Sequence, residues 1–134
     1  MVQLSSPPVT LRPFLKWAGG KRQLIPELLK YVPAHYDRNY EPFIGGGALL
    51  LTLQPTTAII SDRNAELINC YRVVQNAVNK LIETLQQHYN DEAYFYEVRS
   101  WDRQTEFADK TVIQRAARII FLNKTCYNGL FRYV

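Results

Sequence analysis

An acidic residue, a run of three glycines and a second acidic residue are the group in this chain best placed for chemistry. Glu41 opens the segment EPFIGGGALL, Gly45 to Gly47 follow it, and Asp62 closes a later apolar run. A glycine turn lets the backbone approach a ligand closely. A carboxylate at the end of the second strand is where many α/β folds bind ribose hydroxyls. The alternatives are a bare tight turn, a solvated Glu41 and an Asp62 that caps the next helix.

The glycine run fits neither of the common phosphate-binding signatures. A P-loop requires Lys and then Ser or Thr after its last glycine, whereas Ala48 follows Gly47. The dinucleotide signature G-x-G-x-x-G matches at Gly45 and Gly47, but Leu50 stands where its third glycine belongs. Glu41 would also repel a pyrophosphate and attract a cation. We therefore expect a ligand with a ribose, a positive group and no pyrophosphate, a description that S-adenosylmethionine meets.

A second group, FLKWAGGK from Phe14 to Lys21, places two lysines, a tryptophan and a Gly-Gly turn before an expected helix. Helix N-termini attract anions, and Lys21 adds positive charge there. Trp17 offers a flat wall for an adenine or a methionine chain. The alternative is that Phe14 and Trp17 belong to the core and that the lysines are solvated.

These residues need elements that position them, and the hydrophobic pattern predicts an α/β arrangement. We expect a short helix over 21–32, a strand around 40–44, a helix over 48–53 and a strand over 57–62. This is the order of a βαβ unit in an α/β fold. An α/β sheet normally has about five or six strands, so either the fold is unusually small or the chain is incomplete.

Downstream of this unit the pattern predicts helices only. Apolar residues recur at spacings of four and three from Leu67 to Leu85, which predicts one amphipathic helix. Further helices are expected over 94–101 and 112–124, followed by a turn at Asn128-Gly129 and an extended segment.

Composition narrows the classes of function. The 134 residues fit one domain, and the net charge of +4 permits contact with nucleic acid without establishing it. Cys70 and Cys126 form no C-x-x-C pair and lie far from His35 and His88 in the sequence, so we expect no metal site. No apolar run reaches the length of a membrane span and no secretory signal is evident. We therefore expect a cytoplasmic protein without membrane contact.

Four segments, taken in order, resemble Dam-type DNA adenine-N6 methyltransferases. They are FLKWAGGK, EPFIGGGALL, ISDRNAELIN and NKTCYNGLFR, and the resemblance runs from about Arg12 to Arg132. It implies the α/β class, as a partial Rossmann-like methyltransferase fold with a helical target-recognition insert. It divides the chain into an N-terminal arm (1–13), the N-terminal part of an S-adenosylmethionine-binding domain (14–64) and a helical DNA-binding recognition region (65–134), truncated within its hairpin.

The resemblance also implies roles for individual residues. The cofactor, S-adenosylmethionine, would be bound by Trp17, Lys21, Glu41, Pro42, Phe43, Gly45, Gly47 and Asp62. Double-stranded DNA, usually at GATC sites in related enzymes, would be contacted by Lys16, Tyr127, Asn128, Leu130 and Arg132. An arginine can bond guanine O6 and N7 together, and an apolar wedge helps the target adenine leave the stack. Without the resemblance, Asn128-Gly129 would be a bare turn and Arg132 a solvated side chain.

The catalytic D-P-P-Y motif of that family is absent from this sequence. The nearest string, SPPV at Ser6 to Val9, carries no aromatic residue and lies in the leading arm, so we interpret it as a proline-rich tail. We expect an N-terminal portion of a methyltransferase, of a restriction-modification or housekeeping enzyme, that has no catalytic residue of its own and is inactive alone. Its oligomeric state is unknown, and a complementary C-terminal fragment is a candidate partner.

Two other classes of function stay open at this point. The first is a non-catalytic DNA-binding or regulatory module derived from such an enzyme. The second is another ribose-binding enzyme, such as an NAD-dependent one, against which Glu41 and the missing third glycine count.

Overall fold

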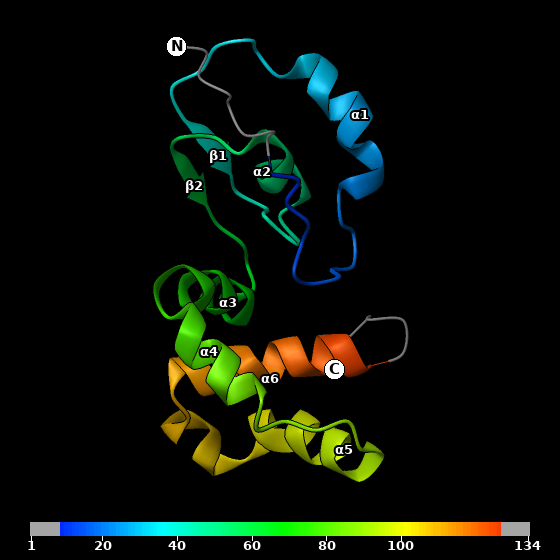
Figure 1. Cartoon of the computed structure of the whole chain (residues 1–134), viewed down its shortest axis with the longest axis vertical. Coiled ribbons are helices and arrows are strands. Elements are labelled where there is room, and N and C mark those ends of the chain that lie inside the picture. The colour runs from blue at the N-terminus through cyan, green and yellow to red at the C-terminus, as the bar shows by residue number, and fades with distance from the viewer. Residues whose placement is uncertain (1–8, 127–134) are drawn as a thin grey trace, which may run out of the picture.

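The computed structural model describes residues 9–126, in which an α/β part stands above a group of helices (Figure 1). Two strands, β1 (Asn39–Glu41) and β2 (Ala58–Ile60), pair in parallel, and α2 (Ala48–Leu53) connects them. Glu41 lies opposite Ile60 in the register. The predicted βαβ order is therefore confirmed.

The expected strand around 40–44 is wrong in its second half. β1 ends at Glu41 because Pro42 follows, and proline has no N–H to donate to a ladder. The chain then turns at once into the glycine run, although the amide of Ile44 still donates to the carbonyl of Ser61 at 3.0 Å. β2 is likewise shorter than the expected 57–62.

The expected helix over 21–32 is wrong as a regular helix. The segment consists of a 3₁₀ turn, η1 (Arg22–Leu24), one turn of α-helix, α1 (Ile25–Leu28), and a second 3₁₀ turn, η2 (Leu29–Tyr31). Pro26 lies in the first turn of α1, as expected. Because proline cannot donate to a carbonyl of the preceding turn, the hydrogen-bond pattern of one continuous helix is interrupted there.

The helical part begins with α3 (Ala65–Asn76) and α4 (Val78–Leu85). The single helix expected from Leu67 to Leu85 is therefore wrong, because the backbone leaves helical geometry at Ala77, with φ −148° and ψ 37°. Leu67 and Leu81 both remain buried. The break thus changes the direction of the chain without taking the apolar face out of the core.

Two further helices complete the described part, α5 (Glu92–Ser100) and α6 (Val112–Thr125), joined by the 3₁₀ turns η3 (Trp101–Arg103) and η4 (Thr105–Asp109). Both helices confirm the pattern-based expectation. Side chains fix where they begin. Asp91 accepts from the amide of Tyr94 at 2.9 Å, and Thr111 and Gln114 form a reciprocal capping box.

α6 is the central helix of the molecule, and its residues from Ala116 to Asn123 are almost all buried. One apolar cluster joins it to the rest of the chain: Leu15 and Ile44 from the α/β part, Leu67, Cys70, Val73 and Leu81 from α3 and α4, and Ala116, Ala117 and Ile119 from α6. The core therefore crosses from the α/β part into the helices. Among the described residues, no helix is long and apolar enough to cross a membrane.

A buried arginine fastens α5 to α6. Arg118 is 1% exposed, and it donates to the carbonyls of Val98 at 2.9 Å and of Arg99 at 2.7 Å, near the end of α5. It also forms an ion pair with Asp102 at 3.2 Å. These partners compensate the cost of burying its charge.

Candidate cofactor site

The glycine run after β1 adopts a backbone that other residues reach only with strain. Gly45 has φ 52° and Gly47 has φ 78°, both in the left-handed region. A Cβ atom on Gly47 would lie 2.7 Å from the hydroxyl of Tyr71, and one on Gly46 would lie 3.3 Å from the carbonyl of Leu15. The glycines therefore allow close packing on two sides as well as a turn.

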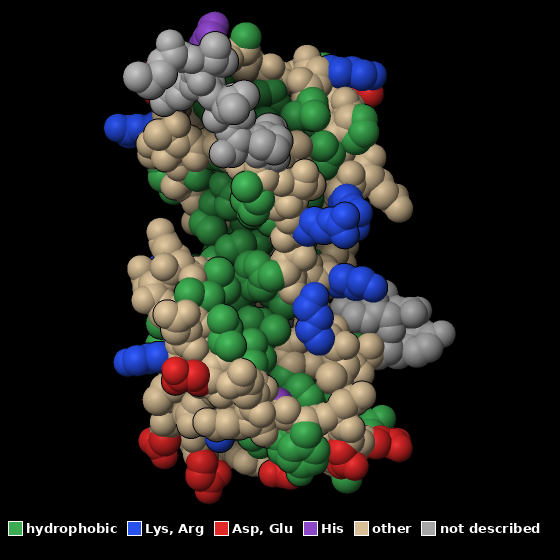
Figure 2. Space-filling view, in the orientation of Figure 1, with side chains coloured by type: hydrophobic (Ala, Val, Ile, Leu, Met, Phe, Trp, Pro, Cys, Tyr) green, Lys and Arg blue, Asp and Glu red, His purple; other side chains and the backbone are tan. Residues whose placement is uncertain are grey.

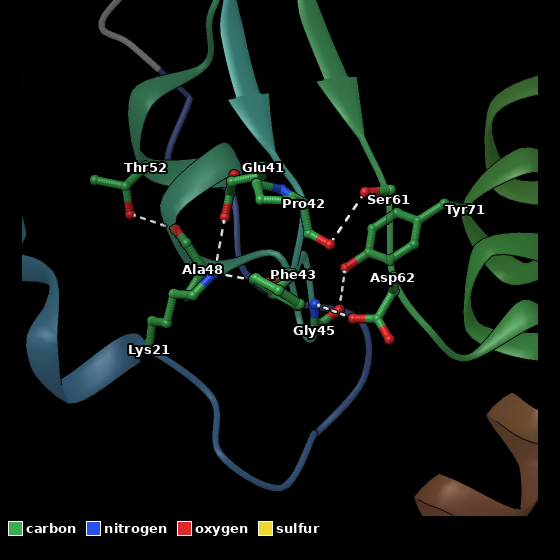
Figure 3. A network of polar contacts seen from close by, with 10 residues as sticks. All are labelled: Lys21, Glu41, Pro42, Phe43, Gly45, Ala48, Thr52, Ser61, Asp62 and Tyr71. Atoms are coloured by element: carbon green, nitrogen blue, oxygen red, sulfur yellow. Dashed lines mark hydrogen bonds and ion pairs between the residues drawn. The ribbon is translucent and has the colours of Figure 1, made fainter.

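Gly45 is held at both of its backbone polar groups (Figure 3). Its amide donates to Asp62 Oδ2 at 3.1 Å, and its carbonyl accepts from the hydroxyl of Tyr71 at 2.7 Å. Asp62 follows β2, whereas Tyr71 lies on α3. The loop between β1 and α2 is thus fixed by two other elements, and it is no bare turn.

The sequence left Asp62 as an alternative candidate for the cap of the next helix. In the structure Asn64 supplies the N-cap of that helix, α3. Asn64 Oδ1 accepts from the amides of Glu66 at 3.0 Å and Leu67 at 3.2 Å, at the start of α3. Asp62 Oδ1 instead accepts from the amide of Asn64 itself, at 3.0 Å. The carboxylate of Asp62 therefore bridges the glycine loop and the entry to α3.

Glu41 is a buried carboxylate with an incomplete set of partners. It is 4% exposed, and its Oε1 lies 3.4 Å from Lys21 Nζ. Its Oε2 has no hydrogen-bond partner among the described residues. Burial raises the pKa of Glu41 above its ordinary value, although Lys21 and the backbone amide of Leu50 act in the opposite direction. The site thus presents an acceptor suited to a positively charged group.

Lys21 is aimed at this loop rather than at solvent. Its Nζ donates to the carbonyl of Phe43 at 2.6 Å as well as approaching Glu41 (Figure 3). The segment before η1 is thereby tied to the segment after β1. The alternative in which both lysines of FLKWAGGK are solvated is wrong for Lys21, whereas the side chain of Lys16 is exposed.

The two segments enclose a cleft of about 180 Å³. Of the residues expected to bind cofactor, the cleft is lined by Trp17, Lys21, Phe43, Gly45 and Asp62. Three others do not line it: Glu41 contacts Lys21, Gly47 is the N-cap residue before α2, and Pro42 accepts at its carbonyl from Ser61 Oγ at 3.0 Å. The structure therefore brings the two expected segments together, and Lys21 connects the cleft to the carboxylate of Glu41.

Sequence reasoning missed Tyr71 and Asn123. Tyr71 fits the apolar spacing of its helix, yet its hydroxyl bonds to Gly45. A buried tyrosine hydroxyl usually finds a partner, and this general rule is the signal that was available. Asn123 Oδ1 accepts from the amide of Lys16 at 3.1 Å, and its Nδ2 donates to the carbonyl of Lys16 at 2.7 Å. No feature of the sequence indicated that pair.

The residues expected to contact DNA are only partly described. The exposed side chain of Lys16 lies on a backbone tied to the end of α6 by Asn123. Tyr127, Asn128, Leu130 and Arg132 lie outside the described residues. Figure 2 shows Lys and Arg side chains gathered near the middle of the visible face and acidic side chains at the end formed by the lower helices. On this face most of the acidic side chains therefore lie away from that basic group.

Comparison with known proteins gives this arrangement a family. Residues 17–134 match the model of the D12 class N6 adenine-specific DNA methyltransferases. The chain is 45% identical over 126 residues to the type II methyltransferase M1.LlaDCHI of Lactococcus lactis subsp. cremoris, with 92% of this chain and 44% of the relative covered. It is 39% identical over 140 residues to the type II methyltransferase M.MjaIII of Methanocaldococcus jannaschii, with 91% and 48% covered.

The DNA adenine methylase of Escherichia coli (strain K12) is 31% identical over 122 residues, with 91% of this chain and 44% of the relative covered. The chain thus spans about half the length of the curated relatives that it matches. The glycine loop, the acid after β2 and the match over residues 17–134 lead to one assignment. The chain belongs to the D12 class of N6 adenine-specific DNA methyltransferases.

Proposed function

We propose that this chain is the cofactor-binding and DNA-recognising portion of an adenine-N6 DNA methyltransferase and that its cleft holds S-adenosylmethionine. One observation carries the proposal: the buried carboxylate of Glu41, whose Oε2 lacks a partner among the described residues, contacts Lys21, which lines the same cleft as Asp62. A cation and a ribose are the two groups that such a pair of acids suits.

The residues fit the parts of that cofactor. Each oxygen of the Asp62 carboxylate accepts one backbone amide, which leaves further acceptor capacity for ribose hydroxyls. Trp17 supplies an aromatic wall of the cleft. Glu41 provides negative charge for a cationic group. When bound, S-adenosylmethionine supplies a methyl group on a positively charged sulfur, and these side chains would hold and orient it.

The same proposal assigns the larger segments. Residues 14–64, with β1, α2 and β2, would begin a Rossmann-like domain, and residues 65–134 would form the helical target-recognition region, both working on DNA in a cytoplasmic setting. Duplex DNA with GATC-like sites would be contacted by Lys16, Tyr127, Asn128, Leu130 and Arg132. The D-P-P-Y motif is absent from the sequence, so catalysis would require polypeptide that this chain does not contain.

An apolar groove supports the need for such a partner. It has a volume of about 460 Å³ and lies between β2 and α3, lined among others by Phe14, Leu50, Ile60, Ile68 and Val74. Figure 2 shows hydrophobic side chains reaching the surface at the narrow middle of the molecule. Exposed apolar grooves of this kind mark interaction sites. We propose that a segment equivalent to the remaining half of the relatives covers it.

Ligand titration tests the cofactor assignment. Calorimetry of the purified 134-residue chain should show binding of S-adenosylmethionine and none of NAD. Asp62→Ala should weaken binding, whereas Asp37→Ala, an exposed residue outside the cleft, should not. Binding of NAD, or S-adenosylmethionine binding that is equally tight in Asp62→Ala, would overturn the assignment.

Methylation assays test the requirement for a partner. The chain alone should transfer no methyl group to adenine-containing duplex DNA, and detectable transfer would refute that expectation.

Titration of DNA with and without S-adenosylmethionine separates the enzyme portion from a non-catalytic DNA-binding module. DNA binding that is indifferent to the cofactor, in a chain that binds no cofactor, would favour the module.

A further inference from the structure

Tyr71 reaches from the helical part of the molecule to the cofactor cleft. It lies on α3, its ring meets Phe14 edge-on with centroids 5.3 Å apart, and its hydroxyl donates to the carbonyl of Gly45 at 2.7 Å. Gly45 lines the cleft. Tyr71 itself does not line that cleft, and its hydroxyl reaches the cleft through its bond to Gly45 (Figure 3).

The bond fixes the carbonyl of a glycine inside a turn that is closed by the bond from the Gly47 amide to the Ile44 carbonyl at 2.9 Å. Gly45 has φ 52°, a conformation that glycine also leaves easily, because its backbone has many accessible states. Its amide is held by Asp62 and its carbonyl by Tyr71. These groups belong to the two peptide units on either side of the Gly45 Cα, so loss of either bond frees the unit that carried it to rotate.

The hydroxyl is suited to act as a permanent donor. Burial raises the pKa of Tyr71, and the nearby carboxylates of Glu41 and Asp62 raise it further. The phenol therefore stays protonated throughout the neutral range, and its hydrogen bond to Gly45 does not titrate there. Unlike a group that titrates near neutral pH, Tyr71 therefore keeps this hydrogen bond when the pH changes within that range.

We propose that Tyr71 is a positioning residue for the cofactor cleft: its hydroxyl sets the backbone of Gly45, and through it the helix α3 controls the shape of the site. The inference rests on the proposed function for its ligand, S-adenosylmethionine. It adds a residue from the helical part to a site that the sequence placed wholly within residues 14–64.

The test compares Tyr71→Phe, which removes one oxygen atom, with Tyr96→Phe, which removes an exposed hydroxyl on α5. Hydrogen exchange of the free protein is the first measurement, since it needs no ligand. In Tyr71→Phe, amides of the loop from Gly45 to Ala48 should exchange about three- to tenfold faster, as expected for the loss of one hydrogen bond. Amides in the middle of α6 should not change.

Calorimetry with S-adenosylmethionine is the second measurement. The Kd should rise about three- to tenfold in Tyr71→Phe and stay unchanged in Tyr96→Phe. If exchange in the loop and the Kd both match wild type, the inference is overturned. If wild type binds no S-adenosylmethionine, the proposed function fails, while the exchange result still decides whether Tyr71 positions the loop.

A double variant provides an independent check. In Gly47→Ala the new methyl would lie 2.7 Å from the Tyr71 hydroxyl, whereas the next nearest atoms of that ring lie at 3.5 Å. Tyr71→Phe should therefore relieve part of the damage from Gly47→Ala, while the strain of φ 78° remains in both backgrounds. We expect the two changes to be less than additive in their effect on loop exchange. Strict additivity would contradict the proposed contact.

Discussion

Replacing Glu41 by glutamine should stabilise the free protein and weaken its binding to S-adenosylmethionine. The carboxylate is 4% exposed, and burial outweighs Lys21 in its effect on the pKa. A neutral amide of the same shape avoids the cost of burying a charge. It also leaves part of its amide unpaired, so we expect a gain of about 1 kcal/mol, or roughly 3–5 °C in melting temperature.

The binding change should have the opposite sign. A negative charge near a partly buried cleft, acting without direct contact, contributes about 1–2 kcal/mol to the binding of a cation, so losing the charge of Glu41 should raise the Kd for S-adenosylmethionine about 5- to 30-fold. The matched control is Glu27→Gln, which removes an exposed carboxylate paired with Lys30 on the neighbouring helical turn. Glu27→Gln should change neither the free energy of unfolding nor the free energy of binding S-adenosylmethionine by more than a few tenths of a kcal/mol.

The pH dependence supplies a further check on Glu41. Because the folded protein raises this pKa above its ordinary value of 4.5, protonation of Glu41 favours the folded state. The contribution is complete below the unfolded pKa and is lost as the pH rises through the folded pKa. Glu41→Gln cannot titrate, so its advantage should be largest at neutral pH and shrink on acidification. Calorimetric melting from pH 7 to pH 4 measures this. A variant that is less stable at pH 7, with an unchanged Kd, would refute the reasoning.

Three other changes test the helical part and its contacts. Arg118→Met should lower the free energy of unfolding by about 3–5 kcal/mol in urea titrations, because the Asp102 ion pair and two carbonyls of α5 lose their partner; an unshifted midpoint would contradict it. Asn123→Ala removes both bonds to the Lys16 backbone and should cost about 1–3 kcal/mol in the same assay. Lys16→Gln should weaken DNA binding and reduce the slope against salt by about one unit in anisotropy titrations, and an equal slope would argue against a phosphate contact.

The cleft could be anticipated from sequence because its parts are local signals. A glycine run after an apolar strand and an acid after the next strand must meet at one edge of a parallel pair, and β1 and β2 do pair in that way. The position of the Lys21 side chain could not be predicted from a hydrophobic pattern, because its contact with Phe43 joins two segments through a side chain. The residue types of FLKWAGGK indicated that segment, and the family resemblance added the expectation that Lys21 binds the cofactor.

The break between α3 and α4 could not be anticipated. Ala77 is a good helix former, and the apolar spacing from Leu67 to Leu85 runs through it without interruption. Tertiary packing of α3 and α4 against α6 decides that the helix breaks at Ala77, and intrinsic helix propensity contains no information about such packing. The same limit hid Tyr71, because an apolar face at helical spacing does not reveal which of its members makes a polar bond.

The bond between Lys16 and Asn123 has a consequence for the order of folding. It joins residues 107 positions apart, so the chain must close a very long loop before the segment carrying Trp17 is fixed. Contacts of such large sequence separation tend to form after local ones. The first residues of the site to be synthesised are then among the last to take their final geometry, and they do so only when the end of α6 is in place.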